Sequence, residues 1–591
     1  MALSPASQEI IATRGAQMFP VLSPAELDRL RRFGECRRYA QGAVLARAGE
    51  VAEGVVVMLS GEAEITQNAG GARLHIVRHG PGSFTGELAQ LSGRPSLVDC
   101  TALTDIEALV IPPRSLRALL IAEAALGERI MRALILRRVG LIETGGGGPV
   151  IVGRADDPAV LRLTNFLRRN GNPYQQLDPA DDSGAQALIE RFSVDLGELP
   201  IVLCPAGQLL RNPTDDALAR CIGLVGAIDQ DRIYDLVVIG AGPAGLATAV
   251  YAGSEGLSTL VLDCRSFGGQ AGASSRIENY LGFPTGISGM ALMARAFNQA
   301  QKFGVEFFIP DEAVRLTCST DPFRLQLANG EEVQARTAVL ATGARYRRLD
   351  LANLEEFEGS SLHYWASPLE AGLVAGQRIA LVGGGNSAGQ AVVYLAAHAE
   401  HVTMIVRRPL EATMSRYLID RIASLANVEV IEGAQIAALD GAERQIEAIR
   451  WREIATGAEI GRPVRHLFSF IGADPNTDWL STSDIQLDAG GFICTGEDAG
   501  PGRHALETCR RGVFAVGDVR SGSVKRVASS VGDGAQVVAA LHKVWRRSVR
   551  VISRQVESPA GSEITAIKRE SESFRSNPNR NDSRGTESRY A

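Results

Sequence analysis

The chain lacks the short motifs that mark dithiol, zinc and hydrolase chemistry. Its eight cysteines are scattered, and no two have the Cys-x-x-Cys spacing of a redox dithiol or a zinc site. Its eight histidines show no ligand spacing, and no Ser-His-Asp, His-Glu-x-x-His or paired-carboxylate motif stands out. We therefore predict no resident metal, and no local motif identifies a catalytic side chain.

Long apolar runs and a strong charge of either sign are also missing. No run reaches the ~18 apolar residues that a membrane-spanning helix needs. Residues 1–15 have no basic start followed by an apolar stretch, so we predict no secretory signal and a cytoplasmic protein. The net charge of −6 gives no reason to expect a nucleic-acid partner.

Glycine, in contrast, is abundant, with 63 of 591 residues, and it clusters beside apolar strands. At roughly 100–200 residues per domain, a chain of this length predicts several domains. Four consecutive glycines at 145–148 form a linker. The predicted segments are 1–143, 149–225, 230–349, 350–468, 469–549 and a polar, disordered tail at 550–591.

The first segment predicts a small β-barrel or jelly roll with flanking helices. Ser23 and Glu26 have capping-box spacing. Short apolar runs separated by turn residues fill the stretch from Arg38 to Ile111, and a helix is expected at 113–142. The second segment alternates strands and helices and predicts a small α/β layer.

The strongest motif begins with the apolar strand 234–239, which runs directly into a glycine-rich loop and a helix. The loop reads Gly240-Ala241-Gly242-Pro243-Ala244-Gly245. Gly240 permits the tight turn, Gly242 lets the backbone approach a pyrophosphate, and Gly245 allows close helix–strand packing. Asp263 ends the next strand, 18 residues after Gly245, where a ribose-binding carboxylate belongs.

A second strand–loop–helix unit follows the strand 378–382. Its loop reads Gly383-Gly384-Gly385-Asn386-Ser387-Ala388. The strand after it ends in Arg407-Arg408 instead of an acid, and arginines suit the 2′-phosphate of NADPH. A solvated basic pair is the alternative interpretation. Two nucleotide folds in tandem imply hydride transfer from NADPH to a bound flavin.

Residues 234–548 resemble the low-molecular-weight thioredoxin reductases. The matching stretches are Gly268-Gly269-Gln270, 277–280, 282–284, Ala341-Thr342-Gly343, Phe470-Ile471-Gly472, Pro475-Asn476, Gly517-Asp518-Val519 and Arg526-Val527-Ala528. The resemblance implies that FAD contacts Gly269, Gln270, Asn279, Thr342, Gly343, Asp518, Arg526, Val527 and Ala528. It also implies that NADPH contacts Gly383, Gly385, Asn386, Ser387, Ala388, Arg407, Arg408 and Ile471. In that family the NADPH domain is inserted into the FAD domain and the proteins are homodimers, so the resemblance implies a homodimer here.

The chain departs from that family at its redox dithiol. Where the family has Cys-x-x-Cys, this sequence has Trp365 and Pro368, and neither side chain can form a thiolate. Glu370 occupies the region of the acid that follows the family's dithiol, although a surface carboxylate is the simpler interpretation. The sequence therefore predicts an electron acceptor outside this module.

The front of the chain resembles two other families. Residues 20–140 are similar to cyclic nucleotide-binding domains, in which Glu87 would hold the ribose 2′-OH. The family's phosphate-binding arginine position holds Ser96, and Arg94 comes two residues early. This leaves two interpretations open: nucleotide binding through Glu87 and Arg94, or a ligand-free regulatory or dimerising module.

Residues 149–222 resemble a thioredoxin or glutaredoxin fold, with Leu199-Pro200-Ile201 similar to its cis-proline strand. The dithiol is missing here too, and we expect Cys204 and Cys221 to be separate core thiols. The expected fold class is multidomain α/β. It has two Rossmann-like three-layer nucleotide-binding domains, preceded by a small jelly-roll β-barrel domain and a thioredoxin-like α/β domain.

Three functions remain open from the sequence. The favoured one is an FAD-dependent oxidoreductase that uses NADPH and an unidentified external acceptor. The second is a redox or cyclic-nucleotide sensor or scaffold with a structural FAD. The third is a thioredoxin-disulfide reductase, as overall similarity would suggest.

Overall fold

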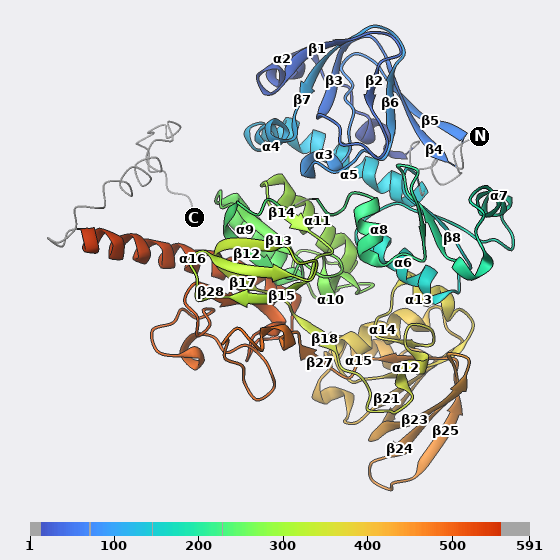
Figure 1. The fold of residues 1–591 in the computed structure, drawn as a ribbon. Coiled ribbons are helices and arrows are strands. Elements are labelled where there is room, and N and C mark those ends of the chain that lie inside the picture. The colour runs from blue at the N-terminus through green and yellow to red at the C-terminus, as the bar shows by residue number, and fades with distance from the viewer. Residues whose placement is uncertain (1–12, 70–71, 145, 227, 557–591) are drawn as a thin grey trace. The chain divides into compact units, whose positions relative to one another are not determined.

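The computed structural model describes residues 13–69, 72–144, 146–226 and 228–556. The described residues fall into two compact units, which divide between Val538 and Ala539. The described part of the second unit, 539–556, belongs to helix α16 (Val527–Val556). Residues 550–556 of the predicted disordered tail are therefore helical, and the rest of that tail lies outside the described residues (Figure 1).

The segment 13–144 contains two antiparallel sheets, with strand orders β1-β7-β3 and β2-β6-β4-β5. Its strands are β1 (Glu35–Tyr39), β2 (Val44–Ala46), β3 (Val55–Ser60), β4 (Ala63–Ala69), β5 (Ala72–His79), β6 (Asp99–Ala102) and β7 (Ile106–Ile111). Its helices are α2 (Pro24–Leu30), η1 (Arg31–Phe33), α3 (Ala89–Ser92), α4 (Pro113–Ala122) and α5 (Ala124–Thr144). The Ser23–Glu26 capping box is present at the start of α2.

The single helix expected at 113–142 is two helices. Glu123 has a non-helical backbone conformation, with φ −113° and ψ 79°, and it separates α4 from α5. Its carboxylate forms ion pairs with Arg29 and Arg32, which precede the barrel. Helical periodicity gives no signal of such a break, because the partners of Glu123 lie about ninety residues earlier in the chain.

Residues 149–225 form a four-stranded sheet of order β11-β10-β8-β9, in which only the β8–β9 pair is parallel. The elements are β8 (Val150–Val152), α6 (Pro158–Arg169), β9 (Gln175–Leu177), α7 (Ser183–Arg191), η2 (Leu196–Glu198), β10 (Ile201–Leu203), β11 (Leu209–Arg211) and α8 (Asp215–Cys221). The Leu199–Pro200 peptide bond is cis, in agreement with the resemblance to a cis-proline strand. The short strand β11 was not among the predicted elements.

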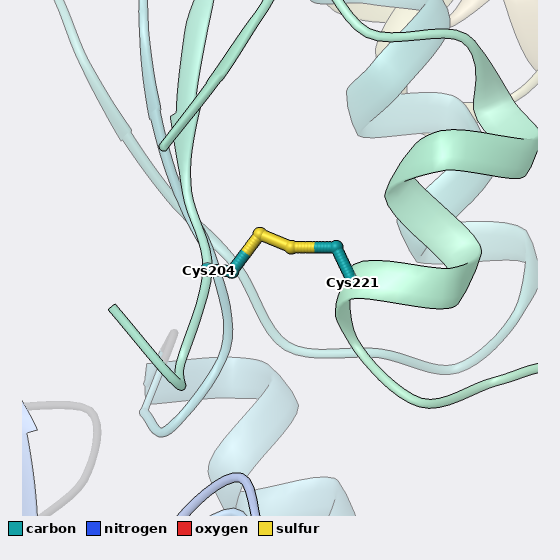
Figure 2. Close-up of a disulfide and its surroundings, with 2 residues drawn as sticks. All are labelled: Cys204 and Cys221. Carbon is teal, nitrogen blue, oxygen red and sulfur yellow. A yellow bond between two sulfur atoms is a disulfide. The ribbon is translucent and has the colours of Figure 1, made fainter. Parts of the chain in front are cut away.

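The expectation that Cys204 and Cys221 are separate thiols is wrong. They form a disulfide with a Cα–Cα distance of 6.1 Å, which joins the end of β10 to the end of α8 (Figure 2). The other six cysteines are free. No spacing motif identifies this pair, because the fold brings together two element ends that are 17 residues apart in sequence.

Residues 228–349 and 469–538 share one seven-stranded sheet, with order β14-β13-β12-β17-β16-β15 and β28 beside β17. Strands β14, β13, β12, β17 and β28 are parallel, whereas β16 and β15 continue as an antiparallel extension. The seven strands are β12 (Ile233–Ile239), β13 (Thr259–Leu262), β14 (Glu306–Phe308), β15 (Ala313–Thr317), β16 (Phe323–Leu327), β17 (Glu332–Leu340) and β28 (Val513–Ala515). Strands β18 (Ala344–Tyr346) and β27 (Ala473–Pro475) form a separate two-stranded antiparallel sheet. The helices are α9 (Pro243–Ser254), α10 (Gly269–Gly272), α11 (Gly289–Lys302), η4 (Asp478–Leu480), η5 (Gly496–Ala499), η6 (Gly517–Val519) and the start of α16.

Residues 350–468 form an all-parallel sheet of order β19-β26-β20-β21-β22 and an antiparallel meander β23-β24-β25. The strands are β19 (Leu362–His363), β20 (Arg378–Val382), β21 (His401–Val406), β22 (Val428–Glu432), β23 (Ala434–Ala442), β24 (Gln445–Glu453), β25 (Glu459–Pro463) and β26 (His466–Ser469). The helices are α12 (Leu354–Phe357), α13 (Pro368–Leu373), α14 (Asn386–Ala396), η3 (Leu410–Ala412) and α15 (Arg416–Ala423). The predicted fold class is confirmed. Two nucleotide-fold sheets built mainly from parallel strands follow a β-rich segment in the chain.

Candidate functional site

The first glycine loop connects the carboxyl end of β12 to the start of α9. Gly240 has φ +109°, and a Cβ atom there would come within 2.2 Å of the Ala341 carbonyl oxygen at the end of β17. The N-cap of α9 is Gly242, and no side chain caps the helix. Its first N–H groups are therefore left for an anion at the carboxyl edge of a parallel sheet.

Other glycines bring distant segments against this loop. A Cβ on Gly269, at the start of α10, would lie 3.1 Å from the Gly242 Cα atom. A Cβ on Gly517, in η6, would lie 2.8 Å from the Ala244 Cβ atom. The predicted FAD residues 240–245, 269–270 and 517–518 thus lie close together around the start of α9, although they come from three separate stretches of the chain.

Asp263 holds the glycine loop and the residues after β13 together. One carboxylate oxygen accepts a hydrogen bond from Ala241 N at 2.9 Å, and the other accepts from Arg265 N and Ser266 N at 3.0 and 3.2 Å. A carboxylate has about four acceptor positions, so it can still take a ribose hydroxyl. Asp263 therefore fixes the glycine loop in addition to its predicted ligand role.

The second half of the FAD-binding segment is attached through Asn476. Its side-chain N–H donates to the Thr342 carbonyl and the Thr342 hydroxyl donates to the Asn476 carbonyl, both at 2.9 Å. Gln270 donates to the Ala344 carbonyl at 2.6 Å. Asn476 was part of a matched stretch but not of the predicted site, and its long-range pairing with Thr342 gives it a positioning role.

The remaining predicted flavin residues lie at the surface of the same segment. Asn279, Arg526 and Ala528 are exposed, whereas Val527, which begins α16, is half-buried. Asp518 lies in η6, and its partial burial raises the pKa of its carboxyl group. Lys525 donates to the Asp518 carbonyl at 2.6 Å, which ties the segment before α16 to η6.

The second glycine loop repeats the geometry of the first. Gly383 has φ +138°, and a Cβ there would lie 2.4 Å from the Phe470 carbonyl oxygen at the end of β26. The N-cap of α14 is Gly385, again without a capping side chain. The side chain of Asn386 exchanges two hydrogen bonds with Ser415 at 2.9 and 2.7 Å, and the sequence pattern gave no signal of this partner.

Arg407 and Arg408 follow the last residue of β21, at the same sheet edge as this loop. Both are exposed, and neither makes an ion pair with any residue that the structure describes. Ile471 packs partly buried against the core beside β26. Ala388 is fully buried in α14, so the helix itself provides the close packing that the loop requires.

The segment in place of the dithiol is fixed by Glu370. The interpretation of Glu370 as a surface carboxylate is wrong, because only 3% of the residue is exposed. Its two oxygens accept from Trp365 Nε1 at 2.8 Å and from Ser367 N at 2.9 Å. Trp365 is thus held at the N-terminal end of α13, which begins at Pro368.

The β-barrel segment encloses a cavity that Glu87 lines, with 4% of the residue exposed. Arg94 does not line this cavity; its guanidinium lies 5.8 Å from the ring centre of Phe297. Of the two residues predicted to bind a nucleotide, Glu87 therefore lines the cavity and Arg94 does not. The cation that does line it is Arg137 on α5, which the sequence analysis missed because it lies fifty residues after Glu87.

These residues fit the two nucleotides that the sequence predicted. Each glycine loop has a conformation and a contact that exclude a side chain, and each lies before an uncapped helix start that suits a phosphate group. Among the described residues, no group of His, Cys, Asp or Glu could hold a metal ion. No helix in the described part is both long and apolar enough to cross a membrane.

Comparison with known proteins agrees with this arrangement. The family model described as pyridine nucleotide-disulphide oxidoreductase matches residues 234–534. The model of the cyclic nucleotide-binding domain matches residues 36–123.

Individual relatives match the same half of the chain. NADPH-dependent thioredoxin reductase 3 of Arabidopsis thaliana is 33% identical over 312 residues, which cover 51% of this chain and 56% of that protein. Thioredoxin reductase of Listeria innocua is 30% identical over 305 residues, covering 52% of this chain and 92% of that protein. The crystal structure of Lactococcus lactis thioredoxin reductase has 27% identity and a TM-score of 0.49, and covers 53% of this chain and 98% of that one.

The chain spans only about half the length of the Arabidopsis relative. Its match to the family model nevertheless extends from β12 into α16, across both glycine loops. The chain therefore belongs to the pyridine nucleotide-disulphide oxidoreductase family, as a thioredoxin reductase-like, NAD(P)H-dependent flavoprotein oxidoreductase with a cyclic nucleotide-binding domain in the same chain.

Proposed function

We propose that this protein transfers a hydride from NADPH to FAD and delivers the electrons to an acceptor outside residues 234–548. The observation that carries the proposal is the second glycine loop, which lies before an uncapped helix and beside two unpaired arginines. A nucleotide fold that served only as scaffold would not need this combination. FAD, when bound, supplies the hydride-accepting chemistry.

The choice of an external acceptor follows from the segment around Trp365. The indole N–H donates to the buried Glu370 carboxylate, so this position contributes a fixed aromatic side chain and no thiolate. The disulfide Cys204–Cys221 lies in the segment 149–225. Cys204 is buried, so its sulfur atom offers little access for thiol exchange, whereas Cys221 is half-buried.

Anaerobic titration tests the proposal directly. NADPH added to the purified flavoprotein should bleach the flavin absorbance, and a panel of quinones, iron–sulfur proteins, free flavins and protein disulfides should then restore it selectively. If neither NADPH nor NADH bleaches the absorbance, the proposed function is wrong. The alternative of a sensor or scaffold with structural FAD would then remain.

The names of the relatives suggest thioredoxin reduction as a competing function. An insulin-reduction assay with thioredoxin and NADPH separates the two. We expect no turnover above the background without enzyme, because no thiolate replaces the missing dithiol. Clear turnover would show that electrons reach thioredoxin by a route that does not use position 365.

A further inference from the structure

The β-barrel of residues 13–144 contains a cavity whose walls are mainly apolar. Its volume is about 100 Å³, and it opens to solvent on one side. Leu45, Val56, Ile65 and Val98 line it from the two sheets, and Leu141 lines it from α5. A cavity of this size and polarity suits a small organic ligand, with a few polar groups to fix its orientation.

Arg137 lines this cavity and has no anionic partner. Its Nε atom donates to the Met18 carbonyl at 2.8 Å, and Nη1 donates to the Gly86 carbonyl at 2.9 Å. Nη2 is buried and makes no hydrogen bond, although only 7% of the residue is exposed. The guanidinium also lies over the rings of Phe19 and Phe84, at 5.2 and 4.5 Å from their centres.

No carboxylate among the described residues forms an ion pair with Arg137, whose only partners are backbone carbonyls and aromatic rings. Burial lowers its pKa to about 9, so it stays protonated near neutral pH. His79, which lines the same cavity, is neutral there because burial and the nearby Arg137 lower its pKa to about 3. A buried, uncompensated cation is costly, and an anion that enters the cavity would offset that cost.

Glu87 supplies a second unsatisfied atom. Its Oε2 atom accepts from Arg138 Nη1 at 3.4 Å, but its Oε1 atom is buried and has no partner. A buried acceptor of this kind is satisfied by a hydroxyl or an N–H group on a ligand. Glu87 follows Gly86, whose carbonyl accepts from Arg137, so the two unsatisfied atoms belong to neighbouring parts of the wall.

The usual cyclic nucleotide phosphate does not fit this polar set. Ser96 stands at the family's arginine position, and its hydroxyl donates to the Val98 carbonyl at 2.8 Å. Among the described lining residues, Arg137 is the only arginine or lysine, and it offers one free nitrogen. A cyclic nucleotide phosphate is usually held by several hydrogen-bond donors, whereas a single carboxylate can be held by the one free donor, Arg137 Nη2.

We propose that this cavity binds an apolar hydroxy acid. Its carboxylate accepts from Arg137 Nη2, its hydroxyl donates to Glu87 Oε1, and its hydrocarbon body packs against the apolar walls. The proposal rests on residues 13–144 alone and is independent of the oxidoreductase function.

Isothermal titration calorimetry on the full-length flavoprotein tests the proposal, with β-hydroxybutyrate as the probe. Its neutral amide and plain butyrate isolate the two polar contacts. We expect the hydroxy acid to bind at least about tenfold more tightly than the amide and several-fold more tightly than butyrate. Equal binding of acid and amide, absence of acid binding, or tighter binding of cyclic AMP than of the acid would each overturn the proposal.

Variants assign the contacts. Arg137→Gln should abolish the discrimination between acid and amide, and Glu87→Gln should abolish that between β-hydroxybutyrate and butyrate. The matched control is Arg132→Gln on the same helix, because Arg132 is an exposed residue that pairs only with Glu128. Since Arg137→Gln also removes two hydrogen bonds to backbone carbonyls, the wild-type comparison of acid with amide decides the proposal by itself.

Discussion

At the scale of single residues, Gly240 and Gly383 occupy equivalent positions in the two nucleotide folds. Each follows a central parallel strand, each has positive φ, and each lies directly against a backbone carbonyl of the neighbouring strand end. An L-residue with a side chain would meet both backbone strain and a steric overlap at these positions. The sequence motif and the structure therefore report the same physical constraint.

Replacing Gly240 by Ala should remove most of the bound flavin. The added Cβ would lie 2.2 Å from the Ala341 carbonyl oxygen, and relief of this overlap would cost more than about 2 kcal/mol. The ratio of flavin to protein absorbance after gel filtration measures the loss. The control is Gly532→Ala, because that glycine lies in α16 with open space around it. Full flavin retention in the Gly240 variant would contradict the assigned role.

Replacing both Arg407 and Arg408 by Glu should reverse the preference for the phosphorylated cofactor. The KM for NADPH should rise about tenfold or more, because two charge-assisted contacts become repulsive, whereas the KM for NADH should change little. Arg416→Glu is the control, since Arg416 is exposed and pairs with Asp420. An equal rise for both cofactors would show that the arginines do not read the 2′-phosphate.

The replacement Glu370→Gln should destabilise the segment around Trp365. An amide cannot accept from both Trp365 and Ser367, so a buried donor loses its partner at a cost of about 1–3 kcal/mol. Urea unfolding measures the effect. Glu355→Gln, at an exposed position in α12, serves as control. An unchanged unfolding midpoint would mean that the carboxylate is dispensable there.

At the scale of elements, the Cys204–Cys221 disulfide fastens α8 to the strand β10. The two cysteines are 17 residues apart, so the bond closes a short loop in the unfolded chain. In the chain-entropy account, a bond across such a loop stabilises the folded state by about 3 kcal/mol. The bond thus compensates for the small core of a short α/β layer.

The double variant Cys204→Ser/Cys221→Ser should lose about this stability and keep NADPH oxidation with an external acceptor. Urea unfolding and steady-state acceptor reduction measure the two quantities, and Cys36→Ser, at an exposed free cysteine, is the control. A thiol titration of the denatured wild-type protein should find six of its eight cysteines free. Loss of acceptor reduction in the double variant would instead make the disulfide an electron carrier.

At the scale of the whole chain, buried histidines make the fold sensitive to acid. His363 on β19 and His466 on β26 approach to 3.1 Å between ring nitrogens. Burial, and to a smaller extent the neighbouring His466 ring, lowers the pKa of His363 to about 3. Burial, and to a smaller extent the positive charge of Arg465, lowers the pKa of His466 to about 4. His79 in the barrel behaves in the same way.

The free energy of unfolding should therefore fall as the pH falls below about 6.5. In the window from about pH 6.5 down to about pH 4, the unfolded chain binds protons that the folded chain does not, so acid favours unfolding. Each buried histidine contributes a loss of up to about 2 kcal/mol by about pH 5, measurable by urea unfolding. His363→Gln should reduce this pH dependence, whereas His75→Gln, at an exposed position, should not. Identical pH dependence in the wild type and both variants would contradict the role assigned to His363.

The sequence by itself determined the two nucleotide folds and their glycine loops. Their signals are local, because a strand, a turn with positive φ and a helix start follow one another within about ten residues. The capping box at Ser23 and the cis-proline strand at Pro200 were predictable for the same reason. Roles in cofactor binding for the individual residues remain predictions, to be tested by the variants above.

The tertiary structure alone decided which distant residues meet. It paired Cys204 with Cys221, buried Glu370 against Trp365, separated Arg94 from the cavity and put Arg137 into it. None of these contacts leaves a periodic pattern, because each joins element ends or helix faces whose distance in space is set by packing. Spacing in sequence predicts the elements, but only packing in three dimensions sets burial and thereby the charge and reactivity of a side chain.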